Sequence, residues 1–178
     1  MCFAIVIVCL SFFEYGVTCN VGHGKTTCTT EDLLQMVMRI NTRRDTCIKP
    51  AFVAALKQGS FTLTGIDDVV KFDDVRVNRG QGYNPSTGVF TAPRKGLYHF
   101  ACVIMAYGKQ EVHYQLNKND AVYIKGYSNT SGYATSTISD VVEMKKGDRV
   151  FVKHRLTSSA QKILGDHHTT FSGYFMQD

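Results

Sequence analysis

The run Gly96–Met105, GLYHFACVIM, constrains the fold more than any other stretch, because ten residues pass without an Asp, Glu, Lys or Arg. Alternate side chains of a strand point to opposite faces of a sheet. One face would carry Tyr98, Phe100, Cys102 and Ile104, and the other Leu97, Ala101, Val103 and Met105. Both faces are apolar, whereas a sandwich needs only one buried face per strand. We therefore expect the second face to be covered by another copy of the chain.

The sequence from Pro50 onward predicts an all-β fold. Short alternating runs such as AVYIKGY, RVFVKHRL and TTFSGYFM are separated by segments rich in Gly, Asn, Asp and Ser, which is typical of a sandwich or barrel. No phosphate-binding Gly-x-x-x-x-Gly-Lys, no Gly-x-Ser-x-Gly and no internal repeat occurs. The length of 178 residues, with 44% hydrophobic content, suits one domain and a short appendage.

Residues 1–19 predict a secretory signal peptide, and hence a secreted, extracellular protein. An apolar run from Phe3 to Phe13 is followed by a small-residue approach to cleavage after Cys19. No Lys or Arg precedes the apolar run, so a buried first strand or a short anchor stays open as the alternative. No later window is apolar enough for a membrane span.

Residues 20–49 predict a neck that contains a short helix. A helix over Thr30–Arg44 would hold Cys28 and Cys47 about 20 Å apart at 1.5 Å per residue. A disulfide needs Cα atoms within about 7 Å. Either the helix breaks near Asn41 and the two cysteines pair, or each forms a disulfide between chains, as in a coiled-coil neck. The remaining Cys102 is expected to be a buried free thiol.

Charge excludes one class of partner. The formal net charge is +5 and the basic residues are dispersed, so no stripe could follow a phosphate backbone and no nucleic acid is expected. Attraction to anionic glycans or cell surfaces remains compatible with this charge.

Seven residues in one spacing connect the chain to a known family. They follow the pattern F-x5-N-x4-Y-x6-F-x5-G-x-Y-x-F and are Phe72, Asn78, Tyr83, Phe90, Gly96, Tyr98 and Phe100. This resembles the globular domain of complement C1q, although Cys102 stands where the family usually has another aromatic residue. The resemblance extends over residues 50–178. It implies a ten-stranded jelly roll, similar to the tumour necrosis factor fold, that assembles as a homotrimer.

The resemblance implies recognition and no enzyme, since no catalytic set is recognisable. Family members without collagen resemble lectins of invertebrate innate immunity, some of which prefer sialic acid. We expect binding of glycans or microbial surface polysaccharides, and the alternative is a secreted signalling or scaffolding ligand of a receptor. Aromatic and polar loop residues are the candidate ligand contacts. They are Tyr107, Tyr127, Tyr133, His154 and Arg155.

The sequence also contains a candidate calcium patch and a candidate glycosylation site. Asp67, Asp68, Asp73 and Asp74 resemble a calcium patch, and some family members bind calcium near the trimer axis, but no EF-hand spacing supports it. We predict no obligatory cofactor or metal and leave calcium open. Asn129, in the sequon Asn-Thr-Ser, is the candidate N-glycosylation site.

Overall fold

The structure, a computed structural model of the chain, describes residues 21–22, 25–26, 34–39, 48–57, 59–66, 68–155 and 160–178. The chain divides into two units, Met1–Ile48 and Lys49–Asp178. In the first, β1 (Val21–Gly22) and β2 (Lys25–Thr26) form a hairpin, and residues 34–39 are helical, within the helix predicted from the sequence. No helix among the described residues is long and apolar enough to cross a membrane.

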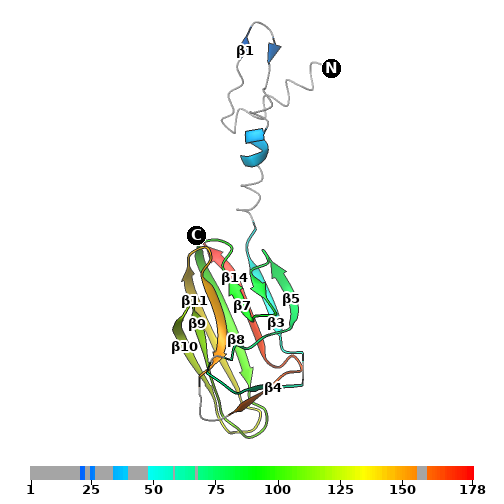
Figure 1. The fold of residues 1–178 in the computed structure, drawn as a ribbon, viewed down its shortest axis with the longest axis vertical. Coiled ribbons are helices and arrows are strands. Elements are labelled where there is room, and N and C mark those ends of the chain that lie inside the picture. The colour runs from blue at the N-terminus through cyan, green and yellow to red at the C-terminus, as the bar shows by residue number, and fades with distance from the viewer. Residues whose placement is uncertain are drawn as a thin grey trace. The chain divides into compact units, whose positions relative to one another are not determined.

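The second unit is a sandwich of two five-stranded antiparallel sheets (Figure 1). Its strands are β3 (Ala51–Ala55), β4 (Ser60–Leu63), β5 (Asp74–Arg79), β6 (Tyr83–Asn84), β7 (Val89–Thr91), β8 (Gly96–Met105), β9 (Val112–Lys118), β10 (Ala121–Ser128), β11 (Thr135–Met144), β12 (Arg149–His154), β13 (Gln161–Leu164) and β14 (Thr170–Gln177). The sheets have the orders β11-β8-β14-β3-β5 and β10-β9-β12-β7-β6, and β4 pairs with β13. The predicted all-β jelly roll is confirmed.

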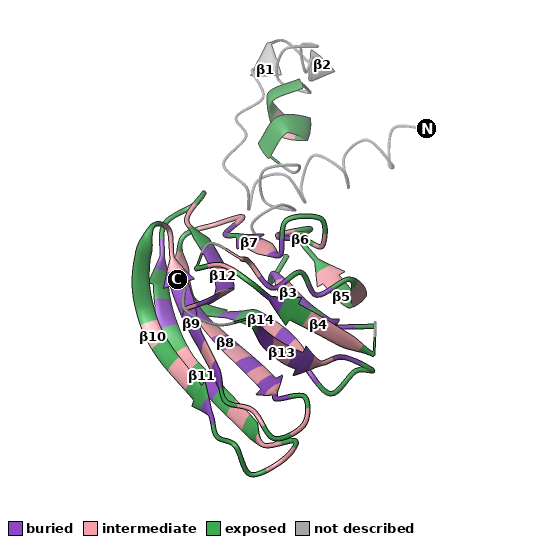
Figure 2. Cartoon of the chain, turned by 60° about the horizontal axis from the view of Figure 1, so that its bottom comes forward, coloured by how far each residue is buried: buried purple, intermediate pink, exposed green. Residues whose placement is uncertain are grey.

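Strand β8 has the two faces that its sequence predicts. Tyr98, Phe100, Cys102 and Ile104 are fully buried between the sheets. The alternate residues are half-buried on the outer face, as the banding along β8 in Figure 2 shows. Cys102 is the buried free thiol expected from the sequence.

The spaced aromatic residues owe their pattern to mutual contact in the core. Phe52 stacks on Tyr83 and on Phe90, with ring centroids 4.8 Å and 5.0 Å apart, and meets Phe171 edge-on at 4.9 Å. Such aromatic pairs contribute beyond the area they bury. The Tyr83 hydroxyl donates to the carbonyl of Phe72 at 3.1 Å, which satisfies the one polar atom of that ring.

Two polar members of the pattern fix the backbone around this core. The Asn78 side-chain amide donates to the Tyr83 carbonyl at 2.8 Å and accepts from the Tyr83 amide at 3.1 Å. Gly96 has φ +139°, and a Cβ there would lie 2.4 Å from the carbonyl oxygen of Gln177. Only glycine fits such a close approach of two strands.

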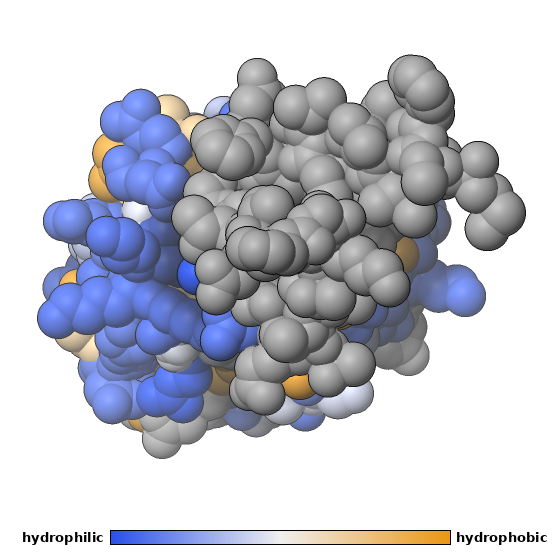
Figure 3. Space-filling view, turned by 90° about the horizontal axis from the view of Figure 1, so that it is seen from above, coloured by the Kyte–Doolittle hydropathy of each residue, from blue (hydrophilic) through white to orange (hydrophobic). Residues whose placement is uncertain are grey.

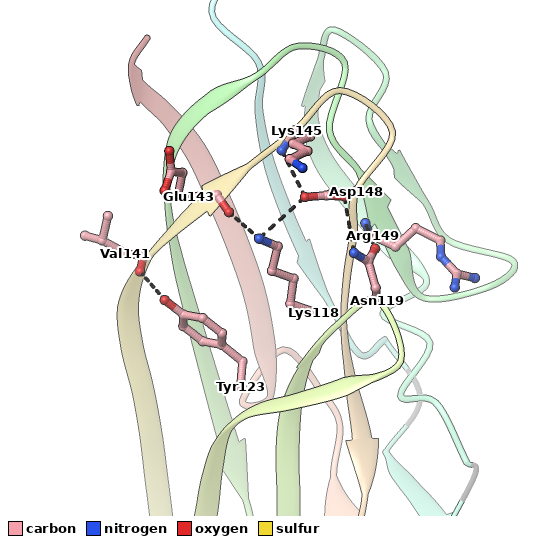
Figure 4. A network of polar contacts seen from close by, with 8 residues as sticks. All are labelled: Lys118, Asn119, Tyr123, Val141, Glu143, Lys145, Asp148 and Arg149. Atoms are coloured by element: carbon pink, nitrogen blue, oxygen red, sulfur yellow. Dashed lines mark hydrogen bonds and ion pairs between the residues drawn. The ribbon is translucent and has the colours of Figure 1, made fainter.

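The two sheets are also joined across their open side. Strand β11 ends its sheet, so the carbonyls on its outer side have no partner strand. The Tyr123 hydroxyl donates to the Val141 carbonyl at 2.8 Å, and the Lys118 ammonium donates to the Glu143 carbonyl at 2.6 Å. Figure 4 shows both contacts reaching across from the other sheet.

Candidate ligand-binding site

The connections that follow β8 and β10 are bonded to each other at one end of the sandwich. This end lies away from the C-terminus (Figure 1). Ala106 donates its amide to the Ala134 carbonyl, and Tyr133 donates to the Gly108 carbonyl, each at 2.9 Å. Strand β13 joins them, because the Tyr107 amide donates to the Lys162 carbonyl at 2.9 Å. Residues far apart in sequence therefore meet here.

Tyr107 and Tyr133 form an exposed aromatic pair, which we call the tyrosine pair. Their ring centroids lie 6.0 Å apart at an interplanar angle of 69°, and the two residues are 38% and 50% exposed. Lys162 Nζ lies 4.5 Å from the centroid of the Tyr107 ring, within cation–π range. This contact holds an ammonium donor beside an open aromatic face. Sequence reasoning missed Lys162, although its alternate position in QKIL could have indicated that it points outward.

Tyr127 and Arg155 belong to a second group centred on His113. The rings of Tyr127 and His113 lie 4.8 Å apart, and Arg155 Nη2 lies 2.7 Å from His113 Nδ1. A guanidinium can only donate, so Nδ1 accepts and the His113 proton sits on Nε2, which faces Glu111 at 3.4 Å. The Tyr127 hydroxyl also donates to Glu111, at 3.3 Å. These contacts fix the orientation of the Tyr127 ring.

His154 does not reach the surface, contrary to the expectation that it is an accessible ligand contact. It occupies a buried position at the end of β12, because Val150 and Val152 before it also point inward. Its Nδ1 lies 3.2 Å from the Gly65 carbonyl and its Nε2 3.0 Å from Gln161 Oε1. His154 thus supports the site from inside.

Gln161 links the buried histidine to the exposed groups. Its Oε1 accepts from the His113 amide at 2.6 Å as well as facing His154. The next residue, Lys162, contacts the Tyr107 ring of the tyrosine pair. Among the described residues, Gln161 Nε2 and Arg155 Nε are buried without a hydrogen-bond partner. Buried donors without a hydrogen-bond partner are rare in folded proteins, so these two atoms indicate a polar part of the site.

The opposite end of the sandwich carries a polar network whose members satisfy one another (Figure 4). Asp148 accepts from the Lys145 amide at 2.9 Å and from Asn119 at 3.2 Å, and lies 3.5 Å from Lys118 Nζ. The Lys145 and Asn119 hydrogen bonds lower the pKa of Asp148. The described surface visible at this end is largely hydrophilic (Figure 3). This network braces the loops, and its exposed tyrosine, Tyr123, is held by the bond from its hydroxyl to the Val141 carbonyl and pairs with no second ring among the described residues.

The described members of the predicted calcium patch, Asp68, Asp73 and Asp74, are engaged within the fold. Asp68 accepts from the Thr64 and Gly65 amides, and these bonds lower its pKa. Asp73 accepts from the Lys57 amide, and Asp74 faces both Arg76 at 3.1 Å and His167 at 3.0 Å. Across the part of the chain that the structure describes, no group of three His, Cys, Asp or Glu side chains could hold a metal ion.

Of the remaining predicted sites, the structure describes the glycosylation site but not the signal peptide or the two neck cysteines. Asn129 is exposed in the connection between β10 and β11. The predicted signal peptide 1–19, Cys28, Cys47 and Asp67 lie outside the described residues.

Comparison with known proteins identifies one family and one fold. Residues 51–176 match the C1q domain family. A curated relative, "Heavy metal-binding protein HIP" of Mytilus edulis, is 27% identical over 114 residues, which cover 63% of this chain and 54% of the relative. The match thus spans about half the length of that relative.

Solved structures share the fold at low identity. The globular domain of zebrafish complement 1qA aligns with a TM-score of 0.59 and 18% identity, covering 73% of this chain and 100% of that one. Eiger TNF of S. frugiperda aligns with a TM-score of 0.58 and 13% identity over 74% and 94% of the two chains. Murine APRIL aligns with a TM-score of 0.55 and 12% identity, covering 72% of this chain and 99% of that one.

Proposed function

The chain belongs to the C1q domain family, and from this premise we propose that it is a secreted, non-enzymatic recognition protein that binds carbohydrate through the tyrosine pair. Sialic acid-containing glycans and microbial polysaccharides are the proposed ligand classes. The alternative is a secreted signalling or scaffolding ligand for a receptor, as the likeness to the fold of tumour necrosis factor proteins permits.

The observation that carries the proposal is the contact among Tyr107, Tyr133 and Lys162. A sugar ring presents an apolar C–H face and a rim of hydroxyl groups. The half-exposed Tyr133 ring offers a flat apolar surface, and the Lys162 ammonium, held over the Tyr107 ring, offers donors beside it. Ligand sites typically combine an apolar surface with a small number of well-placed polar groups. The positive charge of Lys162 favours acidic sugars.

The second group offers further donors at the same end of the sandwich. Arg155 reaches His113 with one guanidinium nitrogen, and Tyr127 is 49% exposed. Glu111 lies in this group, so its balance of charge is less favourable to an anion than that of Lys162. We therefore assign the first sugar contact to the tyrosine pair and place Tyr127 and Arg155 in a secondary role.

Self-association is part of the proposed mechanism. The outer face of the β8 sheet carries apolar side chains from all five strands, and those of four strands are exposed. Its exposed members are Val53, Val77, Val141, Tyr174 and Met176, with half-buried residues of β8 between them. We propose that this face is buried in a homotrimer. Three weak sites on one rigid assembly can raise the apparent affinity by roughly 10² or more.

The name of the mussel relative raises metal binding as a further outcome. The described residues offer no more than pairs such as His167 and Asp74, whereas a zinc site needs at least three protein ligands. Carbohydrate recognition therefore stands first, and each binding assay should be run with calcium, with zinc and with a chelator. Binding of zinc without any glycan binding would favour the metal alternative.

A glycan array tests the proposal directly. Secreted protein should bind acidic glycans, and Tyr133→Ala or Lys162→Met should reduce binding at least tenfold, since each removes about 1.4 kcal/mol or more of contact. Tyr123→Ala and Lys145→Met are matched controls, because they remove the same side chains at the opposite end.

Two outcomes would contradict the proposal. If a trimeric protein binds no immobilised glycan or microbial polysaccharide under any of the metal conditions, carbohydrate recognition fails. If the four variants bind equally well, the ligand contacts lie elsewhere. A cell-surface receptor screen with the same trimer would then test the signalling alternative.

A further inference from the structure

The connection between β10 and β11 presents a complete N-glycosylation sequon, Asn129-Thr130-Ser131. All three residues are exposed. The side-chain oxygen of Asn129 accepts a hydrogen bond from the Ser131 amide at 3.0 Å, so the oxygen and not the nitrogen makes this contact. The amide nitrogen is the atom that receives a glycan.

The chain contains a natural comparison. Asn84-Pro85-Ser86 is the second Asn-x-Ser/Thr triplet, and Asn84 accepts from the Ser86 amide in the same way, at 2.9 Å. Proline at the middle position disqualifies this triplet as an acceptor. Asn129 is thus left as the one acceptor that the sequence rules allow.

The loop that carries Asn129 also carries half of the tyrosine pair. Ser128 donates its hydroxyl to the Ala134 carbonyl at 2.6 Å, which closes the loop at its base. Tyr133 lies four residues after Asn129, so their Cα atoms are at most about 14 Å apart even if the segment were fully extended. The Tyr133 ring packs against Tyr107 at the same end.

We infer that Asn129 carries an N-linked glycan and that this glycan covers the tyrosine pair, which makes glycosylation a regulator of the site. The regulatory part rests on the proposed function. In the modification, Asn129 Nδ2 bonds to the anomeric carbon of a lipid-pyrophosphate-linked oligosaccharide. The bond from that carbon to the pyrophosphate oxygen breaks, the lipid pyrophosphate leaves, and Nδ2 loses one proton.

Covering follows from tethering. A group held by a short flexible connection has an effective concentration on the order of millimolar at a neighbouring site. A single sugar contact on two tyrosine rings is weak, so a tethered sugar competes with free ligand on equal terms. An attached glycan would lower the affinity for external sugars without any change in fold.

The first test is chemical. Wild-type protein secreted from eukaryotic cells should show a mass that falls after treatment with a peptide N-glycosidase, with Asn129 converted to Asp. Ser131→Ala, which keeps Asn129, should lack the glycan. Pro85→Ala should gain a second glycan at Asn84. An unmodified Asn129 in a chain whose Pro85→Ala variant is modified at Asn84 would overturn the inference, because the cell would be shown competent.

The second test measures covering without any external ligand. Tyrosine nitration by tetranitromethane, followed by peptide mass spectrometry, should be several-fold slower at Tyr107 and Tyr133 in glycosylated protein than in Ser131→Ala. Tyr123, 42% exposed at the other end of β10, should react equally in both. Pro85→Ala/Ser131→Ala, with its glycan at Asn84 alone, should leave the tyrosine pair fully reactive.

The outcomes separate the two proposals. Equal nitration of the pair in glycosylated and Ser131→Ala protein overturns the covering, whatever the protein binds. Protection of the pair together with no binding of external glycan by Ser131→Ala would sustain the covering and defeat the proposed function. If both proposals hold, Ser131→Ala should bind the array more tightly than the glycosylated wild type.

Discussion

The Lys118 ammonium donates a 2.6 Å hydrogen bond to the main-chain carbonyl of Glu143, on the free edge of β11. A side chain from one sheet thus occupies a backbone acceptor of the other, at a position where a strand of another molecule could otherwise pair. Tyr123 makes the equivalent contact with the Val141 carbonyl.

Removing these two contacts should destabilise the domain and promote aggregation. We expect Lys118→Met and Tyr123→Phe each to lower the free energy of unfolding by about 1 kcal/mol, the usual net value of one hydrogen bond. The double variant should scatter more light on incubation at elevated temperature, since the β11 edge is then open. Lys145→Met is the control, because Lys145 bonds to Asp148 through its main-chain amide, which the substitution keeps. Unchanged stability and solubility in the double variant would show that the edge is protected by other means.

Acid should destabilise the domain through Asp68 and Asp148. Hydrogen bonds from Thr64 and Lys145, respectively, hold the pKa values of these carboxyls below the ordinary 3.8 in the folded protein. The unfolded chain therefore binds these protons more readily. The stabilisation is complete above the unfolded pKa and is lost as pH falls through the folded pKa.

Urea titrations between neutral pH and about pH 3 check this prediction. The midpoint for the wild type should fall as pH drops below about 4. Asp148→Asn should be less stable at neutral pH and should lose less on acidification. A wild-type midpoint that stays constant over this range would contradict the assignment of these two carboxyls.

Ala101→Arg should yield monomers. Ala101 lies opposite Ser139 on one neighbouring strand and Ser172 on the other, near the centre of the outer face of its sheet. An arginine there would place an unpaired charge in the proposed subunit interface, at a cost of several kcal/mol. Light scattering should report the change. A trimer that binds glycans should also agglutinate cells, and the monomeric variant should lose agglutination while it retains weak glycan binding. Ala121→Arg, at an exposed position of the other sheet, should stay trimeric.

Cys102 should be unreactive in the folded protein. Burial raises the pKa of its thiol far above the ordinary value, and the side chain is fully buried. In a Cys28→Ser/Cys47→Ser background, a disulfide reagent should label it only after unfolding in denaturant. Rapid labelling of native protein would indicate that the sandwich opens locally.

If the predicted helix over Thr30–Arg44 is continuous, Cys28 and Cys47 should form disulfides between chains. Non-reducing electrophoresis should then show covalent oligomers that collapse on reduction, and Cys28→Ser should leave smaller species. Both cysteines lie outside the described residues, so this stays a prediction from helix length. A monomeric band with both thiols oxidised would mean that the two cysteines pair within one chain.

The alternation of β8 was sufficient to predict its two faces, because the side-chain period of a strand is fixed by its geometry. The same alternation in RVFVKHRL places His154 inward with Val150 and Val152. The prediction of His154 as a loop residue was wrong, because the alternation of the strand continues through it. The partners of His154 are Gly65, in the connection after β4, and Gln161, the first residue of β13, and no local sequence pattern indicates them.

The tyrosine pair could be predicted as residues but not as a pair. Tyr107 and Tyr133 are brought together by the register that places Thr135 opposite Met105. A shift of one residue in that register would separate the two rings and would move the side chains of one strand to the opposite face of the sheet. Lys162 reaches the pair through β13, whose partner β4 lies about a hundred residues earlier in the chain. Such long-range pairings depend on the whole fold.

The central position of β14 has a consequence for biosynthesis. This strand lies between β8 and β3, and its Phe171 is fully buried in the core, yet it is the last strand of the domain to leave the ribosome. Until then the nascent sheet has a gap at its middle, with β3 and β8 unpaired along that gap. The domain must complete its folding after its synthesis. A chain truncated before Thr170 should keep this gap open and bind chaperones.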